Sequence, residues 1–245
     1  MKITYIQHSG FMVEFRECAL IFDFYKGTLP SIRQDKKIYV FASHNHQDHF
    51  QEKIFNWQEI YPQIQYILSD DIQAEPAGNR VFIGPEKDLE LEHIRIKTLR
   101  STDEGVAFFV SVREGTGGQA VNIYHAGDLN WWHWEEEGPA YNREMEKNFK
   151  QALSPIEGAH IDAAFIPVDP RLENAYYWGI DWFMRHTDTA LVYPMHLWRR
   201  YQVIDKLMEQ PETKDYRDRI ARLEKEDEGA CHSGNDMIEC ENVRI

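Results

Sequence analysis

One stretch, residues 41–50, constrains the fold and the chemistry of this chain more than any other. The apolar segment 38–42 is typical of a buried β-strand, and it runs directly into a polar loop that carries His44, His46, Asp48 and His49. Imidazole nitrogens and carboxylate oxygens are good ligands for zinc and related divalent cations. In an extended turn His44 and His46 can face one ion, while Asp48 and His49 can serve a second ion nearby. The stretch therefore predicts a strand that ends at a centre for one or two metal ions.

Composition limits what can surround such a centre. The chain has 245 residues, of which 42% are hydrophobic, which is enough apolar surface for a sizeable core. Lys and Arg together number 27 against 41 Asp and Glu, which gives a formal net charge of −14. Because a field of that sign repels phosphate backbones and anionic membranes, we expect neither nucleic acid nor a membrane as a partner. A small-molecule substrate is the expected partner, and the oligomeric state is not predicted.

Targeting signals and cysteines bear on the compartment. No basic stretch followed by an apolar run precedes the first strand, and no window approaches the roughly 18 apolar residues that span a bilayer. Cys18, Cys231 and Cys240 are odd in number and lack C-x-x-C spacing, which argues against a disulfide framework and a cysteine zinc site. We therefore expect a cytoplasmic protein.

The order of the predicted elements indicates an α/β fold. Strands dominate the first half, and strands alternate with helices in the second half, which favours two sheets covered by helices in a single domain over residues 1–245. Strands are expected at 3–7, 11–15, 19–24, 38–42, 65–68, 89–99, 106–112, 120–125, 161–168 and 190–193. Helices are expected at 52–61, 141–153, 182–186 and 199–208.

The His-x-His-x-Asp-His loop after a strand resembles the hallmark of the metallo-β-lactamase-fold hydrolases. Two later segments fit the same resemblance. Strand 120–125 leads to Gly127-Asp128, which is similar to the bridging-carboxylate motif of these proteins, and strand 190–193 leads to His196, which is similar to their last metal ligand. Segments 6–11 and 21–23 look like the amino-terminal hairpin of the small branch that includes the ascorbate-phosphate-lactonase-like proteins. The resemblance implies a four-layer αββα sandwich with metals at the sheet edge between its halves.

One motif departs from this resemblance. Most relatives supply another histidine between the loop and Gly-Asp, but the corresponding segment here, residues 100–108, has none. Asp103 could replace it with an oxygen ligand, and Glu104 is an alternative. A third alternative is a single ion held by Asp48, His49, Asp128 and His196. Zinc is the expected metal, and an oxygen-rich first site would shift the preference toward manganese or iron.

Several residues outside the motifs could shape a site. The run Asn130 to Trp134 could line a substrate pocket with His133 as a proton donor, or its rings could close the edge of the sandwich. His8 is expected to be structural, with orientation of metal ligands as the alternative. Asp169 and Arg171 lie in a loop after a strand, where they could form a pocket wall or a surface salt bridge.

These observations favour a metal-dependent hydrolase. The resemblance implies metal-bound hydroxide as the nucleophile and Asp48 as the residue that orients the attacking water. The expected substrate is a small ester, lactone or phosphodiester, for which the branch resemblance suggests an anionic compound. The alternative is a non-enzymatic metal-binding or sensory protein with a degenerate first metal site, which the missing histidine favours.

Overall fold

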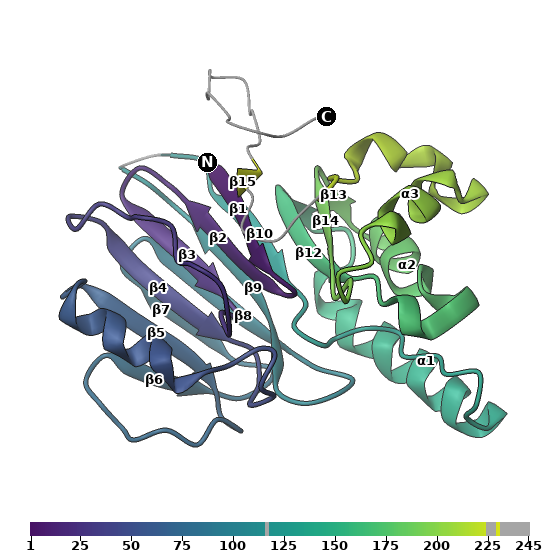
Figure 1. The fold of residues 1–245 in the computed structure, drawn as a ribbon, viewed down its shortest axis with the longest axis horizontal. Coiled ribbons are helices and arrows are strands. Elements are labelled where there is room, and N and C mark those ends of the chain that lie inside the picture. Colours follow the sequence, from purple (N-terminus) through teal and green to yellow (C-terminus); the bar gives the residue numbers. More distant parts are fainter. Residues whose placement is uncertain (116–117, 224–228, 231–245) are drawn as a thin grey trace.

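Two β-sheets form the centre of the protein in a computed structural model that describes residues 1–115, 118–223 and 229–230 (Figure 1). Within these residues the first sheet has the strand order β15 (Gly229–Ala230), β1 (Lys2–Gln7), β2 (Gly10–Glu14), β3 (Cys18–Phe22), β4 (Lys37–Ala42), β5 (Ile64–Ser69) and β6 (Arg80–Ile83). The second has the order β14 (Val192–Met195), β12 (Ala163–Pro167), β10 (Val121–His125), β9 (Val106–Val112), β8 (Ile94–Arg100) and β7 (Asp88–Leu91). A short parallel pair joins β11 (His160–Ile161) and β13 (Asp188–Thr189).

The first sheet is buried on both faces, which explains its nearly continuous apolar strands. In β3, Cys18, Leu20 and Phe22 enter the core between the two sheets, while Ala19 and Ile21 enter a second core on the outer face. Side chains alternate between the faces of a strand, so a strand covered on both sides must be apolar at every position. All five residues of β3 are buried.

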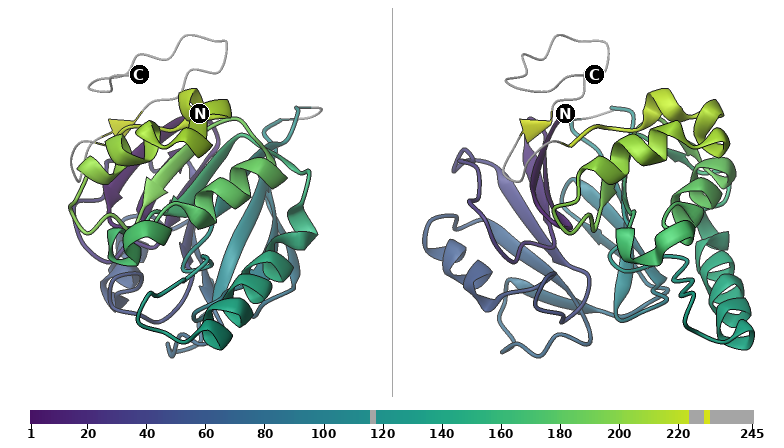
Figure 2. Two further views of the ribbon diagram at one scale, coloured as in Figure 1. Left: turned by 90° about the vertical axis from the view of Figure 1, so that its right-hand side faces the viewer. Right: turned by 45° about the vertical axis from the view of Figure 1, so that its right-hand side comes forward.

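Helices cover the outer faces of both sheets and complete four layers (Figures 1 and 2). The 3-10 helix η1 (Glu52–Glu59) places Ile54 and Phe55 in the outer core of the first sheet. The α-helices α1 (Pro139–Leu153), α2 (Trp178–His186) and α3 (Gln202–Glu209) contribute buried residues to the core of the second sheet. Shorter 3-10 helices are η2 (Ser154–Ile156), η3 (Pro170–Ala175), η4 (Pro211–Asp215) and η5 (Arg217–Arg219). The predicted αββα sandwich is confirmed, with a 3-10 helix in one outer layer. No helix in the described part of the chain is both long and apolar enough to cross a membrane.

The strand directions decide where polar side chains collect. β1 and β3 are both antiparallel to β2, and β3 is parallel to β4. In the second sheet, β10, β12 and β14 are mutually parallel. Strands β1, β3 and β4 therefore end at one edge of the first sheet, and β10, β12 and β14 end at one edge of the second. Loops at the carboxyl ends of parallel strands commonly carry function.

Some predicted elements differ from the structure. The predicted strand 89–99 is two strands, β7 and β8, because the chain reverses at Glu92-His93, where His93 adopts a φ of 67°. The predicted helix at 52–61 is present as the 3-10 helix η1, Glu52–Glu59. α2 begins at Trp178 instead of Trp182, and α3 begins at Gln202 instead of Arg199, whose φ of 60° excludes it from a helix. Cys18 is buried, whereas Cys231 and Cys240 lie outside the described residues.

Candidate metal centre

Six of the predicted metal ligands meet at the carboxyl ends of the strands. Among the described residues, two groups place their ligand atoms within 4.8 Å of one another: the first consists of His44, His46 and Asp128, and the second of His8, Asp48, His49 and His196. Asp128 joins the groups, because its Oδ1 lies 3.2 Å from His49 Nε2 and 3.3 Å from His196 Nε2, while its Oδ2 lies 3.7 Å from His44 Nε2. The Asp128 carboxylate therefore stands between two sets of imidazoles.

Asp23, directly after β3, fixes the proton positions on two of these imidazoles. Its carboxylate is fully buried and accepts hydrogen bonds from Ser43 N at 2.8 Å, Ser43 Oγ at 2.7 Å and His49 Nδ1 at 2.7 Å. Because the Ser43 hydroxyl donates to Asp23, its oxygen accepts from His44 Nδ1, which is 2.9 Å away. Both histidines therefore carry their proton on Nδ1 and present the lone pair of Nε2 toward Asp128.

Asp169, two residues after β12, does the same for His196. Its buried Oδ2 accepts from His196 Nδ1 at 2.9 Å and from Trp198 Nε1 at 2.9 Å. A carboxylate that holds one nitrogen of a histidine while the other nitrogen faces inward is the usual support for a metal-binding imidazole. His49 and His196 both have this arrangement.

The inward-facing atoms fit a cation and not one another. His49 Nε2 and His196 Nε2 lie 3.3 Å apart, and both are within 3.3 Å of Asp128 Oδ1. When both imidazoles carry a proton on Nδ1 alone, all three atoms have lone pairs, and Asp128 Oδ1 is buried without a hydrogen bond to any described residue. Buried acceptors that face each other need a proton or a metal ion between them. Nitrogen and carboxylate oxygen are also the donor set of catalytic zinc and related sites.

The pKa directions agree with a site that attracts positive charge. Burial opposes protonation of His49, but the charge of Asp128, whose Oδ1 lies 3.2 Å from His49 Nε2, and the hydrogen bond to Asp23 raise the pKa of His49 well above its usual value. The pKa of His196 is raised in the same way, against burial, by Asp128 and Asp169. The pKa of Asp128 lies well below its usual range, because these two imidazoles outweigh the effect of burial. Protons and metal ions therefore compete for the same atoms.

Two glycines allow the backbone to close around Ser43. Gly105 has a φ of +67°, and a Cβ at this position would lie 2.0 Å from the Ser43 carbonyl oxygen. Gly127 has a φ of +51°, and its Cβ would lie 2.7 Å from Ser43 Cβ. Only glycine fits both requirements, a left-handed conformation and the absence of a side chain. Ser43 is thereby held in the position from which it bridges Asp23 and His44.

Three non-glycine residues at the centre are also in left-handed conformations: His8 with φ 55°, Asp23 with φ 43° and His196 with φ 64°. Each such residue costs on the order of 1–3 kcal/mol and persists only where its surroundings enforce it. Each one follows the last residue of a strand directly. Left-handed conformations that collect at one set of strand ends indicate a functional site.

His8 lies in the second group, beside Asp48 and His196. From sequence, orientation of metal ligands is only the alternative role of this histidine. Its Nε2 lies 3.3 Å from Asp48 Oδ2, and its ring lies 4.1 Å from the ring of His196. Burial is the main cause that lowers the pKa of His8 to about 4, so the ring is neutral at neutral pH. Although partial burial acts to raise it, the hydrogen bond to His8 and the charge of His49 hold the pKa of Asp48 well below its usual value. Asp48 is therefore an ionised hydrogen-bond acceptor.

Comparison with known proteins bears on the fold. No protein-family model and no curated protein matches the chain. Igni18, a metallo hydrolase from Ignicoccus hospitalis, is 17% identical with a TM-score of 0.61 over 96% of this chain and 99% of that one. YhfI, a metallo-β-lactamase fold protein from Bacillus subtilis, is 12% identical with a TM-score of 0.52 over 80% of this chain and 85% of that one. This chain has the metallo-β-lactamase fold. The predicted resemblance to the ascorbate-phosphate-lactonase branch stays a prediction.

A third similar structure is named as a possible metal-dependent hydrolase, from Veillonella parvula. It is 12% identical, with a TM-score of 0.56 over 95% of this chain and 99% of that one. At these identities the likeness shows the fold, and the chemistry has to be argued from the residues of this chain.

The first group contains no third histidine among the described residues, as the sequence of residues 100–108 leads one to expect. Asp103 belongs to neither metal-competent group among the described residues, and its side chain is exposed. Partial desolvation and then the charge of Asp128 raise the pKa of Asp103, so the two carboxylates repel each other. Glu104 Oε2 lies 3.6 Å from His46 Nε2. The two acidic alternatives therefore both lie beside the first group, and Asp103 as a ligand stays a prediction.

The tryptophan run divides between two sides of its loop. Trp132 faces the centre, with its ring 5.7 Å from the ring of His196, and Trp134 stacks on Trp132 at 6.1 Å. His133 instead packs 4.5 Å from the ring of Trp178 and lines a separate cavity of about 480 Å³ beside α1. His133 belongs to neither metal-competent group in the described part of the chain, so its role as proton donor stays a prediction.

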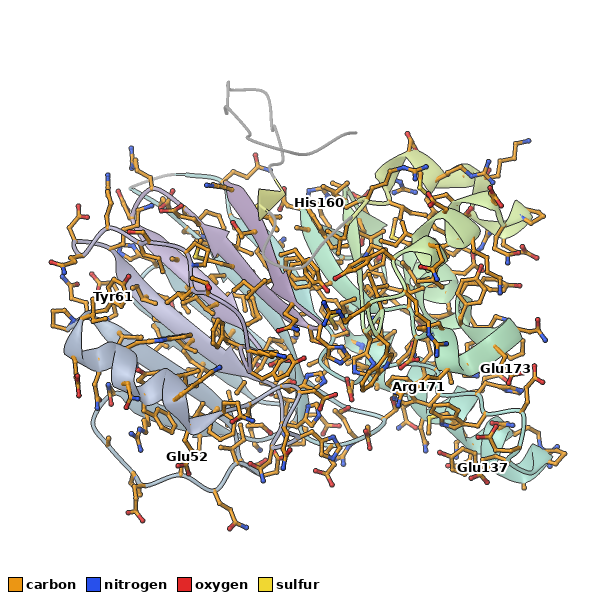
Figure 3. The ribbon with its side chains drawn as sticks, in the orientation of Figure 1. Glu52, Tyr61, Glu137, His160, Arg171 and Glu173 are labelled. Carbon is orange, nitrogen blue, oxygen red and sulfur yellow. The ribbon has the colours of Figure 1, made fainter. Side chains whose placement is uncertain are left out.

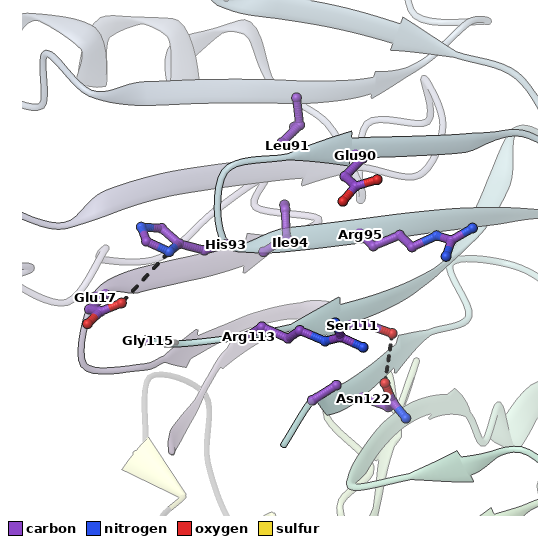
Figure 4. Close-up of a pocket in the computed structure, with 11 residues that line it drawn as sticks. Glu17, Glu90, Leu91, His93, Ile94, Arg95, Ser111, Arg113, Gly115 and Asn122 are labelled. Carbon is purple, nitrogen blue, oxygen red and sulfur yellow. Dashed lines mark hydrogen bonds and ion pairs between the residues drawn. The ribbon is translucent and has the colours of Figure 1, made fainter. Parts of the chain in front are cut away.

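His93 lies in a different cavity, as Figure 4 shows. This cavity of about 680 Å³ is lined by residues of β7 to β10, and the His93 ring points toward Glu17, whose Oε2 is 3.8 Å away. None of the residues in the two groups that could hold a metal ion lines this cavity. His93 is thus a surface residue of the second sheet and does not supply the missing histidine.

Sequence reasoning missed the supporting carboxylates. From sequence, Asp23 belongs to the segment that resembles the amino-terminal hairpin, and Asp169 is expected in a pocket wall or a surface salt bridge. The signal that identifies them, together with His8, is their position: each comes one or two residues after a buried strand, at the same edge as the histidine loop.

Proposed function

We propose that this protein is a metal-dependent hydrolase whose centre lies at the shared strand ends. His44, His46 and Asp128 would hold one ion. Asp48, His49 and His196 would hold the other, with Asp128 Oδ1 beside both histidines. The observation that carries the proposal is the set of buried nitrogen and oxygen atoms around Asp128 Oδ1, which converge on one point that either protons or a metal ion can occupy.

The two groups differ in ways that bear on the metal. The second group is deeply buried and supported by Asp23 and Asp169, whereas the first has an exposed member, His46. We therefore expect the second group to bind its ion more tightly. Zinc is the expected metal because histidine nitrogen predominates, and manganese or iron would be favoured if carboxylate oxygen from Asp103 or Glu104 completes the first group.

The side chains at the centre suit hydrolysis by an activated water. A divalent cation bound there supplies Lewis acidity toward a carbonyl or phosphoryl oxygen and lowers the pKa of water. Asp48 is ionised and half-buried, so one of its oxygens can accept a hydrogen bond from a water and orient it. His8 Nε2 lies 3.3 Å from Asp48 Oδ2 and would help to position this carboxylate. The substrate class that we propose is a small ester, lactone or phosphodiester.

A substrate panel tests this function. The wild type, loaded with zinc or manganese, is assayed with lactones, phosphodiesters and thioesters, and we expect turnover of at least one class. Asp128→Ala removes the carboxylate that lies between the two groups, so this turnover should vanish. Asp162→Asn serves as a matched control, because Asp162 accepts a hydrogen bond from Asn122 N at 2.8 Å and belongs to neither group. Equal turnover in the wild type and in Asp128→Ala would refute the assignment of the site.

A non-enzymatic metal-binding or sensory role is the second candidate. The first group has three residues and an exposed histidine, which favours an ion that exchanges with solution. This role predicts metal binding with every substrate class inert. A metal-dependent change in the thermal midpoint or in the oligomeric state, without turnover, would favour it over the hydrolase.

A further inference from the structure

Arg171 stands between aromatic rings that border the metal centre. It is the second residue of η3, close to the end of β12, and Figure 3 labels it near the lower edge of the sheets, on the side of the α-helices. Its Cζ lies 4.5 Å from the ring centroid of Trp198 and 5.7 Å from that of Trp134. The Trp198 ring in turn lies 4.8 Å from the ring of His8 and 5.6 Å from that of His196. The guanidinium is therefore one aromatic ring away from two residues of the second group.

The hydrogen bonds of Arg171 leave part of its donor set available. Nε donates to Asp169 Oδ1 and Oδ2 at 3.0 Å, and Nη2 donates to Asp169 Oδ2 at 2.6 Å. Nη1 donates to none of the residues that the structure describes, and the side chain is 44% exposed. An anchored guanidinium with a free edge is suited to bidentate recognition of an oxyanion.

The charge of Asp169 is shared among several donors. The same carboxylate accepts from Arg171, from His196 Nδ1 and from Trp198 Nε1. Partial burial acts to lower the pKa of Arg171, but Asp169 and then the charges of Asp128 and Asp48 raise it. The guanidinium thus lies within the field of the metal-binding carboxylates. Cations at the centre would offset those two carboxylates and leave Arg171 as a cation beside it.

We propose that Arg171, flanked by Trp134 and Trp198, binds a carboxylate or phosphate group of the substrate beside the bond that is cleaved. This inference rests on the proposed hydrolase function, and it restricts the substrate to compounds that carry a negative charge apart from the scissile group. The charge of −14 on the chain does not oppose it, because the charge that such a group meets is local.

A pair of esters tests the proposal through selectivity. Mono(4-nitrophenyl) glutarate carries a carboxylate, and 4-nitrophenyl pentanoate has the same chain without the charge. For the metal-loaded wild type we expect a higher kcat/KM for the anionic ester. In Arg171→Gln the ratio of anionic to neutral kcat/KM should fall about 10- to 100-fold, mainly through KM, which corresponds to one charge-assisted hydrogen-bonded contact. Arg171→Lys, which keeps the charge and loses the fork, should retain part of the preference.

Two comparisons separate this role from a purely structural one. If Arg171 only supports Asp169, its replacement changes both esters in parallel and the ratio stays constant, which would overturn the proposal. Arg185→Gln is the matched control, because Arg185 pairs with Asp181 in the same way at 3.0 Å and is 41% exposed. This control should leave both rates and the ratio unchanged.

A binding measurement keeps failure of the inference distinct from failure of the hydrolase function. Quenching of tryptophan fluorescence by pentanoate and by butyl phosphate, with 1-pentanol as the neutral control, is measured for the metal-loaded wild type and Arg171→Gln. If the affinity for either anion is at least about tenfold lower in Arg171→Gln than in the wild type, the anion site is supported even if no ester is hydrolysed. The tighter of the two anions identifies carboxylate or phosphate. Equal affinities in both proteins would overturn the proposal, whatever the enzyme assays show.

Discussion

Replacement of Asp23 by Asn should weaken metal binding without removing any ligand. Asp23 Oδ1 accepts from Ser43 N, and Oδ2 accepts from Ser43 Oγ and His49 Nδ1. Asn has nearly the same size as Asp and keeps one acceptor oxygen. This oxygen has to face Ser43 N, because that backbone N–H group needs an acceptor. The amide nitrogen then takes the place of Oδ2 and presents N–H groups toward two former donors. His49 can resolve this conflict by moving its proton to Nε2, the atom that faces Asp128.

The size of the effect follows from this change of tautomer. A proton on Nε2 occupies the lone pair that would bind the ion, and loss of a supporting partner of this kind typically costs 10- to 100-fold in metal affinity. We therefore expect the metal dissociation constant to rise about 10- to 100-fold, which is about 1.4–2.7 kcal/mol. His44 is linked to Asp23 through Ser43 Oγ, so the first group should weaken as well.

Competition of the protein with a zinc-binding dye measures this constant. Circular dichroism of the metal-free variant establishes that the chain is folded, and Asp162→Asn is the matched control for an Asp to Asn change outside the two groups. A folded Asp23→Asn protein that binds zinc as tightly as the wild type would refute the tautomer reasoning.

Three further predictions concern the backbone, the first group and pH. Gly105→Ala should lower the free energy of unfolding by more than about 2 kcal/mol in denaturant titrations, because its Cβ would lie 2.0 Å from Ser43 O at a φ of +67°, and an unchanged midpoint would contradict this. Asp103→Ala should reduce metal content more than Glu104→Ala, because a cation relieves its repulsion by Asp128, and the reverse order would favour Glu104 as the ligand. The raised pKa of His49 means that protons compete with metal from above pH 6.5, so affinity should fall as pH falls, about tenfold per unit for each displaced proton. Calorimetry in two buffers of different ionisation enthalpy should show proton release at pH 7, and a release of zero would contradict this account.

The clustering of the candidate ligands was predictable from sequence because their signals are local. His44, His46, Asp48 and His49 fall within six residues after a strand, and the apolar run before them is long enough to be identified. The four-layer fold followed from the family resemblance that this loop and the later motifs carry, and both sheets are present as expected.

The supporting residues were not predictable in the same way, because their roles depend on contacts between distant segments. Asp23 meets His49 across 26 residues, and Asp169 meets His196 across 27. The division of the tryptophan run between two sides depends on how α1 and α2 pack, which periodicity does not encode. The left-handed turn at His93 split a predicted strand for a similar reason, since nothing in an alternating pattern marks a reversal without glycine.

Metal content of the wild type and of Asp128→Ala, measured by mass spectrometry after loading with zinc and removal of excess metal, tests the central claim most directly. Asp128 is the one carboxylate that contacts histidines of both groups in the described part of the chain. The account predicts one or two ions bound per wild-type chain and a large loss of bound metal in Asp128→Ala, with the variant still folded. Metal bound equally by both proteins, or by neither, would contradict it.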